Sequence, residues 1–456
     1  MAARDSLMHS LLTARKLALS SGCDEAEAFG TMSRARIVDV EQNLIKAASS
    51  IIEEGLFVRV TSGKRVGLAF SNSLTKDGIA SCVRSATKLS KIAEEDSQWH
   101  GFAPAKKKSQ SMTGLLDSRT SSLELSDLRE MADQMMHGAL SVSKAVTVTG
   151  GQVQTYHRML GICNSSGVEQ TMGESRISAF CSSVSGKGRG VSPDCLDIRV
   201  SRKPDINFEA LGRSSGRIAV LCSTNEEPKT EESDVVLSPL AVGAGDMGIL
   251  SVMMSRGSSG ESVIRKNTFL IGKLGEQVAS KNLTISDNPL AKGRSGSRPF
   301  DDEGTPTSRT ELITNGVLKG FLWNSYFGNI AGHGSTGNAV RDLSTGSLSI
   351  SPLNLEVQPG KGNWESLASK IDHGYLVWAC QGAHTSNFES GAYSFVPSPC
   401  LLIKKGEVVG GVRGAMVSGN VLELMKNLEM VGSDVTDLGS GIMPSMSFRE
   451  LKITAG

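Results

Sequence analysis

Residues 298–341 read RPFDDEGTPTSRTELITNGVLKGFLWNSYFGNIAGHGSTGNAVR, and this stretch decides how the second half of the chain is expected to fold. It begins with three consecutive acids at positions 301–303, followed by glycine. Two short apolar runs then flank Asn315-Gly316, a dipeptide that favours a tight hairpin turn. A glycine-rich turn at 335–338 leads to Arg341. The pattern predicts short strands separated by turns.

The three acids allow two interpretations. Acids next to glycine at a strand edge can bind a metal or orient the amine of a peptide. Acids in such a position are also typical of turns, where the carboxylates bond to nearby backbone N–H groups. The local sequence leaves both interpretations open.

The whole chain has 456 residues, which is long for one hydrophobic core and favours two domains. It carries 48 Lys and Arg against 47 Asp and Glu, a net charge of +1. This balance argues against nucleic acid as the main partner, which usually requires a concentrated basic face. Eight cysteines without a CxxC pair, and no secretory signal, predict a cytoplasmic protein whose thiols are mostly buried and reduced.

One segment, residues 235–254, imitates a membrane span but contains Pro239 and a central Asp246. A mid-bilayer aspartate costs roughly 2.5–3.5 kcal/mol. A buried strand followed by a buried helix explains the segment better, and no membrane association is expected.

The first half predicts an α+β domain with an antiparallel sheet. Two apolar runs around residues 61–64 predict a hairpin. Small residues at 212–216 suggest close helix packing. The expected elements are helices at 6–19, 73–92, 126–142 and 206–223, strands at 25–32, 37–44, 56–60, 65–70 and across 146–184, and a long surface connection at 97–122.

The second half predicts a strand-rich domain that begins after an acidic segment at 225–234. The expected domains are therefore residues 1–232 and 233–456, both mainly antiparallel sheets with flanking helices. No repeat of 20–50 residues is visible, which argues against a solenoid or propeller. The best strand candidates are 317–323, 347–351, 375–379, 401–404 and 446–453, with helices at 364–371 and 421–427.

The serial order of several motifs resembles the TldD/PmbA family, two related kinds of subunit of a metal-dependent peptidase complex. The motifs are the 298–341 stretch, AHTSNFESGAYSF at 383–395, the GE at 406–407 followed by GAMVSGN at 414–420, and the C-terminal segment from Pro444 to Gly456. The resemblance is firm from about residue 234 onward.

The resemblance also bears on whether this chain binds a metal. Zinc-binding members of the family carry HExxxH in the helix after the strand that here reads VVL, and a Cys-Gly motif near the C-terminus. Here residues 244–254 contain neither histidine nor glutamate, and LGSGI stands at 438–442. The chain therefore resembles the PmbA (TldE) kind of subunit, which implies no cofactor in this chain and zinc in a partner subunit.

Other chemistries have weaker support. Residues 243–248 match GxGxxG, but the surrounding βαβ alternation of a dinucleotide-binding domain is missing. The seven histidines are scattered, so a metal site would need three distant ones to converge. Cys380 lies four residues before His384, yet its apolar neighbours are typical of a buried strand residue.

The resemblance implies a partner subunit that forms a heterodimer with a zinc-bearing TldD-like chain, helps enclose a cavity and holds unfolded peptide. A homodimer is the alternative assembly. The rival functions are a self-sufficient peptidase acting as a homodimer and a non-enzymatic peptide-binding scaffold. Under the family interpretation, the predicted cavity-lining residues are Asp301, Asp302, Glu303, Ser335, Thr336, Asn338, Arg341 and Asn387.

Overall fold

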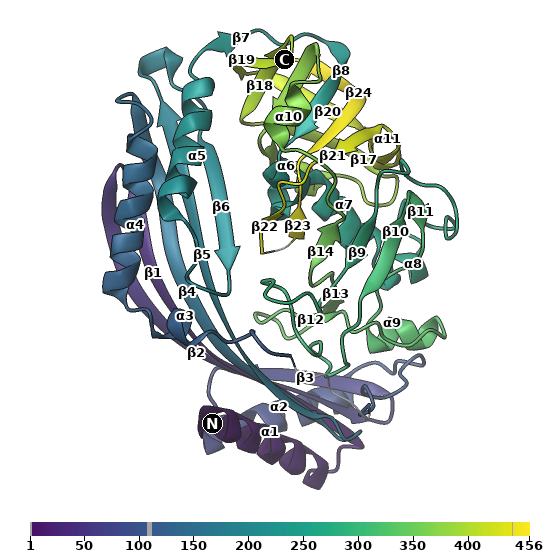
Figure 1. Cartoon of the computed structure of the whole chain (residues 1–456). Coiled ribbons are helices and arrows are strands. Elements are labelled where there is room, and N and C mark those ends of the chain that lie inside the picture. Colours follow the sequence, from purple (N-terminus) through teal and green to yellow (C-terminus); the bar gives the residue numbers. More distant parts are fainter. Residues whose placement is uncertain (1, 107–111, 440) are drawn as a thin grey trace.

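The computed structural model describes residues 2–106, 112–439 and 441–456. Its first half contains a curved antiparallel sheet with strand order β3-β2-β1-β4-β5-β6 (Figure 1). The strands are β1 (Glu25–Glu41), β2 (Leu44–Ser62), β3 (Arg65–Ser71), β4 (Val146–Asn164), β5 (Glu169–Ser185) and β6 (Cys195–Ser201). The α+β class with mainly antiparallel sheets is confirmed.

The sheet contains two long hairpins. The predicted β2–β3 hairpin is confirmed, with Ser62 opposite Arg65. The expected strand at 37–44 was wrong at its end, because β1 stops at Glu41 and the chain reverses. Gln42 and Asn43 have φ of 51° and 62°, and two successive positive φ values are the geometry of a type I′ turn. Asparagine tolerates this conformation, but Gln-Asn is a weaker turn signal than Asn-Gly.

Four helices pack on one face of this sheet: α1 (Ala2–Ser20), α2 (Lys76–Ile92), α4 (Leu125–Leu140) and α5 (Phe208–Leu221). Alternation along β1 explains this arrangement, since Ala28 packs in the α1–α2 cluster and Val38 in the α4 cluster. Phe29 points to the opposite face, where it packs with Phe300 of the second half.

The predicted close packing of α5 is confirmed. A Cβ atom added at Gly212 would lie 1.8 Å from the carbonyl oxygen of Met135 in α4, and one added at Gly138 would lie 2.1 Å from the carbonyl oxygen of Glu209. Only glycine lets the two backbones approach this closely.

The connection expected on the surface at 97–122 is partly buried. Phe102 and Leu115 are buried, and Thr120 in α3 (Ser118–Ser122) donates to the carbonyl of Arg202. Residues 107–111 of this segment lie outside the described residues. The polar composition of residues 97–122 therefore gave no indication of these buried contacts.

The second half holds the larger sheet, with the path β16-β17-β20-β24-β8-β15-β18-β19-β7 and β21 beside β24. Most of its pairs are antiparallel, but β8 runs parallel to β15 and β7 runs parallel to β19. Its strands are β7 (Asn225–Glu226), β8 (Glu231–Leu237), β15 (His373–Val377), β16 (Cys380–Gln381), β17 (Ala392–Pro397), β18 (Cys400–Lys404), β19 (Glu407–Val412), β20 (Ala415–Asn420), β21 (Leu428–Val431) and β24 (Met446–Ala455).

A six-stranded sheet, β11-β10-β9-β14-β23-β22, lies beside it, with a two-stranded sheet formed by β12 and β13. The predicted turn at Asn315-Gly316 joins β10 to β11, and both residues have positive φ. The strand expected at 317–323 is shorter and ends at Leu318. These strands are β9 (Ile285–Asp287), β10 (Thr310–Thr314), β11 (Val317–Leu318), β12 (Ala339–Arg341), β13 (Leu348–Ile350), β14 (Leu355–Val357), β22 (Thr436–Asp437) and β23 (Gly441–Met443).

Short helices complete the second half. The segment 235–254 forms the end of β8, then α6 and α7, as the sequence predicted. Among the described residues, no helix has the length and apolar character needed to cross a membrane. The helices are α6 (Pro239–Gly243), α7 (Ile249–Gly257), α8 (Gly260–Ile264), α9 (Ser325–Ile330), α10 (Trp364–Ala368) and α11 (Val421–Lys426).

Candidate functional site

Five of the eight predicted site residues come together in a buried polar junction between the two halves of the chain. They are Asp301, Asp302, Glu303, Asn338 and Arg341, all at most 5% exposed. Ser335 and Thr336 lie half-buried in the adjoining turn. Asn387 lies apart from them, exposed in the loop before β17.

Asp301 fixes two backbone segments. Its Oδ1 accepts from the N–H of Glu303 at 3.0 Å and of Thr305 at 2.9 Å, and its Oδ2 accepts from the N–H of Ala339 at 3.0 Å. Burial, followed by repulsion from Glu303, raises the pKa of Asp301 to about 8, although the three N–H donors act in the opposite direction. This carboxyl group attaches the 301–305 turn to β12.

The two neighbouring acids are also fully engaged. Asp302 accepts from the guanidinium of Arg298 and, at 2.8 Å, from the N–H of Arg341. Glu303 accepts from the N–H of Ser325 at 2.8 Å and from its hydroxyl at 2.6 Å. Because Ser325 is the first residue of α9, Glu303 places a negative charge at the positive end of that helix.

Arg341 connects this junction to the sheet of the first half. Its Nη2 lies 2.6 Å from Oε1 of Glu27 in β1, and its guanidinium stacks on Phe29 at 4.8 Å. Glu27 also accepts two hydrogen bonds from Arg59 of β2, both at 2.8 Å. Burial alone would raise the pKa of Glu27, but the charges of Arg59 and Arg341 outweigh it and lower that pKa.

Glu27 and Arg59 were not among the predicted site residues. A signal was present, because alternation places Glu27 on the same face as Phe29. The hairpin register sets Glu27 directly opposite Arg59. An opposite-charge pair on an otherwise apolar strand pair predicts a buried ionic contact, but it does not reveal the third partner, 314 residues away.

The turn at 335–338 is held by hydrogen bonds. Asn338 donates to Asp287 Oδ2 at 2.5 Å and accepts from the Thr336 hydroxyl at 2.7 Å. The Ser335 hydroxyl donates to the carbonyl of Trp323 at 3.1 Å. In its own loop, Asn387 accepts from two backbone N–H groups, at 2.9 and 3.0 Å. These hydrogen bonds fix the conformation of both loops.

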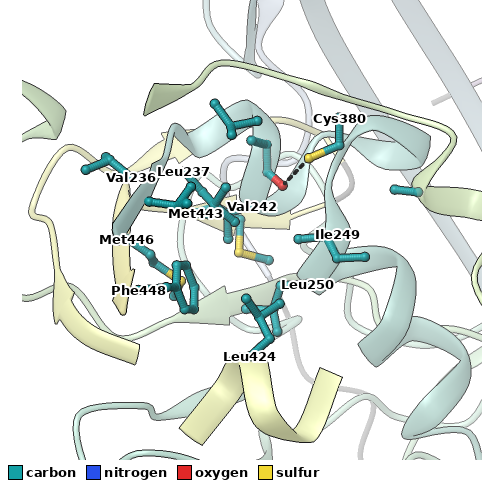
Figure 2. Packing of buried hydrophobic residues seen from close by; sticks show 14 of the residues in the cluster. Val236, Leu237, Val242, Ile249, Leu250, Cys380, Leu424, Met443, Met446 and Phe448 are labelled. Atoms are coloured by element: carbon teal, nitrogen blue, oxygen red, sulfur yellow. Dashed lines mark hydrogen bonds between the residues drawn. The ribbon is translucent and has the colours of Figure 1, made fainter. Parts of the chain in front are cut away.

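A second region, around α6 and α7, is occupied by hydrocarbon and thioether side chains (Figure 2). Leu237, Val242, Ile249 and Leu250 converge there with Met443. A Cβ atom added at position 243 would lie 2.1 Å from Cγ of Met443. The interior beside α7 is thus tightly filled.

Polar groups in this region are few. Within residues 244–254 there is no imidazole, thiol or glutamate, and the single carboxylate, Asp246, is exposed. The Cys380 thiol donates to the carbonyl of Ala241 at 3.6 Å, and burial raises the pKa of that thiol well above its usual range. The prediction that Cys380 is a buried strand residue is confirmed. Zinc binds imidazole, thiolate and carboxylate, and of these residues 244–254 supply only the exposed carboxylate of Asp246, which is too few for a zinc site.

The histidines do not converge. His333 packs against Trp323 with ring centroids 5.4 Å apart, and His373 contacts Glu231 at 2.8 Å. Across residues 2–106, 112–439 and 441–456, no three His, Cys, Asp or Glu side chains are grouped so that they could hold a metal ion. All eight cysteines are free and buried, as predicted.

Comparisons with known proteins agree with this architecture. Residues 230–455 match the family domain described as "PmbA/TldA metallopeptidase C-terminal domain", and residues 26–90 match "PmbA/TldA metallopeptidase domain 1". The chain belongs to the PmbA/TldD family.

Similar proteins extend over nearly the whole chain. The crystal structure of TldE from Thermococcus kodakarensis superimposes with a TM-score of 0.89 at 28% identity, covering 98% of this chain and 99% of that one. A protein named metalloprotease from Methanothermobacter thermautotrophicus is 27% identical over 88% of this chain and 89% of its own length. Metalloprotease PmbA of Escherichia coli O157:H7 is 25% identical over 98% and 96%.

Proposed function

We propose that this chain is the non-metal-binding partner subunit of a PmbA/TldD-type metallopeptidase, and that a related chain supplies the zinc. The observation that carries the proposal is the apolar packing around α7, the helix in which zinc-binding members of the family carry HExxxH. Zinc sites need imidazole, thiolate or carboxylate ligands, and residues 244–254 present only the exposed Asp246. The eight free, buried cysteines support a cytoplasmic location.

The contribution of this subunit would be to hold an unfolded peptide in an extended form. Loop backbone and polar side chains can do this by hydrogen bonds that depend little on the peptide sequence. The exposed Asn387 and the half-buried Ser335 and Thr336 are the proposed peptide contacts. Asp301, Asp302 and Asn338 would support these contacts indirectly, since their hydrogen bonds fix the 335–338 turn and the backbone of β12 that follows it. Glu303 and Arg341 belong to the same buried junction and would have the same supporting role.

Reconstitution tests this function. The chain is expressed alone and together with a family member that contains HExxxH, and cleavage of an unstructured peptide is followed. We expect cleavage only when both chains are present, and loss of cleavage when a histidine of the partner's motif is replaced. In the reconstituted complex, Asn387→Ala should raise KM more than it lowers kcat.

Two results would contradict the proposal. Chelator-sensitive cleavage by the isolated chain would favour a self-sufficient peptidase acting as a homodimer. Failure to associate with any HExxxH-bearing chain, combined with tight binding of unfolded peptide, would favour a non-enzymatic scaffold.

A further inference from the structure

A cavity of about 270 Å³ lies at the boundary between the two halves of the chain. The first half contributes residues of β6 and α5 to its lining, and the second half contributes residues at the start of α6, at α10 and at β22. Figure 1 shows β6 beside β22 at this boundary. The proposed peptide contacts Ser335, Thr336 and Asn387 do not line this cavity, so the proposed function gives its side chains no role.

Two indole rings line the cavity. Trp364 of α10 and Trp378, which follows β15, meet edge to face, with ring centroids 5.9 Å apart and an interplanar angle of 87°. Trp378 is 6% exposed, and its indole N–H donates to the carbonyl oxygen of Leu196 at 2.8 Å. This hydrogen bond fixes the orientation of an aromatic surface that can contact hydrocarbon and attract a cation.

One carboxylate oxygen in the lining is unused. Asp197 is 3% exposed, and its Oδ1 accepts from the N–H of Ile198 at 2.8 Å and from Nη1 of Arg199 at 2.5 Å. Within the part of the chain that the structure describes, Oδ2 of Asp197 accepts no hydrogen bond. Buried polar atoms normally have a hydrogen-bond partner, so a ligand that carries an N–H group would complete this carboxylate.

The other charges of the lining favour a cation over an anion. Asp434 accepts three hydrogen bonds, all from neutral donors, and therefore keeps its full negative charge. Glu365 pairs with Arg217 at 3.0 Å. Arg199 is the one cationic residue among the described residues of the lining, and it already pairs with Asp197. The lining therefore carries an excess of negative charge.

We propose that this cavity binds a primary alkylammonium group, which is either the side chain of a lysine or a free amine. The ammonium group donates to Oδ2 of Asp197, and the methylene groups lie against the indoles of Trp364 and Trp378. An inorganic cation would leave the indoles without an apolar contact, and a neutral alkyl chain would leave Oδ2 unpaired. Binding of the amine does not depend on the proposed function, because it is measured on the isolated chain without peptide cleavage.

The indole N–H resonances of the isolated chain, labelled with ¹⁵N-tryptophan, report binding directly. The chain has four tryptophans, and butylammonium chloride should shift the resonances of Trp364 and Trp378 but not those of Trp99 and Trp323, which lie outside the lining. We expect a dissociation constant on the order of 1 mM for a ligand with so few atoms. Ammonium chloride and 1-butanol each lack one part of the ligand and should bind roughly 10-fold more weakly.

Two substitutions test the assigned contacts. Asp197→Asn keeps the shape of the side chain but removes its charge, so butylammonium should bind about 10-fold more weakly. Asp133→Asn on α4 is the matched control, since this exposed aspartate lies outside the cavity, and it should leave the dissociation constant unchanged. Trp364→Leu at a half-buried position is a second route if Asp197→Asn fails to fold, and it should also weaken binding, followed at Trp378.

Capped Gly-Lys-Gly and its norleucine analogue separate the two sources of the amine. Saturation by the lysine peptide, but not by the norleucine peptide, assigns the cavity to lysine side chains. Binding of butylammonium without binding of the lysine peptide assigns it to free amines. The proposal is overturned if butylammonium at about 50 mM shifts neither cavity indole. It is also overturned if ammonium chloride or 1-butanol binds as tightly as butylammonium, or if folded Asp197→Asn binds as the unaltered chain does.

Discussion

The junction around Glu27 and the cluster around α7 are equally inaccessible to water, yet they are built from opposite kinds of side chain. The junction joins Glu27 of β1 to Arg59 and to Arg341 of β12 through charged hydrogen bonds. The α7 cluster is held by aliphatic and thioether contacts, with Ile249 and Met443 fully buried. Hydrocarbon packing is non-directional, whereas ion pairs require a defined geometry. We infer that the charges fix how the two halves of the chain are aligned, and that the cluster stabilises the second half by non-directional packing.

The largest loss of stability is expected for a substitution at the junction. Glu27→Gln preserves the shape of the side chain but removes the carboxylate that accepts hydrogen bonds from the guanidinium groups of Arg59 and Arg341, and Arg59 then keeps only Glu303 at 3.9 Å. Breaking such a buried pair costs about 3–5 kcal/mol. Urea unfolding would measure this cost. The matched control is Glu53→Gln on β2, an exposed glutamate whose replacement should change stability by less than about 0.5 kcal/mol.

Arg341→Met sharpens this test, because Glu27 then retains the two hydrogen bonds from Arg59. Arg341→Met should therefore lower the free energy of unfolding by less than Glu27→Gln does. Equal costs, or a cost below about 1 kcal/mol for Glu27→Gln, would show that the charges do not align the two halves.

A second buried carboxylate predicts sensitivity to acid. Burial alone would raise the pKa of Glu174, but Arg158 and then Arg176, Arg202 and Arg298 outweigh it and lower that pKa to about 2. The unfolded chain binds this proton near pH 4.5, so stability is present above that pH and is lost as the pH falls toward 2. The loss should amount to about 3 kcal/mol.

Urea unfolding measured from about pH 6 down to about pH 2.5 would check this loss of stability. Glu174→Gln should be less stable at neutral pH and should show a flatter dependence in acid. An unchanged slope in the variant would assign the acid sensitivity to other carboxylates.

A smaller loss of stability is expected for a substitution in the α7 cluster. Ile249→Val removes one methylene group from a fully buried site and should cost about 1 kcal/mol. Val409→Ala in β19 is a control on an aliphatic residue that is 38% exposed, and it should cost less. Thermal unfolding would compare the two, and an equal loss in both would mean that the cluster is not tightly packed.

The smallest effect on stability is expected at Asn387. Its side chain accepts two local N–H bonds in an exposed loop, so Asn387→Ala should cost at most about 1 kcal/mol. If the loop contacts peptide, the same substitution should raise KM in the reconstituted complex. A large stability loss with unchanged KM would assign the residue to folding alone.

Local patterns in the sequence predicted a large part of the fold. Alternation and turn residues located the hairpins at Ser62-Gly63 and Asn315-Gly316, and small residues located the close approach of α5 to α4. The turn at Gln42-Asn43 was missed because its positive φ values are not required by those residue types.

The candidate site was harder to predict. The acids at 301–303 were recognised as a group, but their burial depends on Arg341, Arg298 and backbone N–H groups from distant segments. Such contacts are set by the tertiary fold and leave no periodic signal in the chain. The family motifs located the site's segment, and only the structure showed which of its side chains face inward.

Metal analysis of the isolated chain tests the central claim most directly. The purified protein is equilibrated with excess zinc, dialysed, and its bound metal is measured by mass spectrometry together with peptide cleavage. We predict far less than one zinc per chain and no cleavage. One tightly held zinc per chain, whose removal abolishes peptide cleavage, would contradict the assignment of this chain as the subunit without the metal.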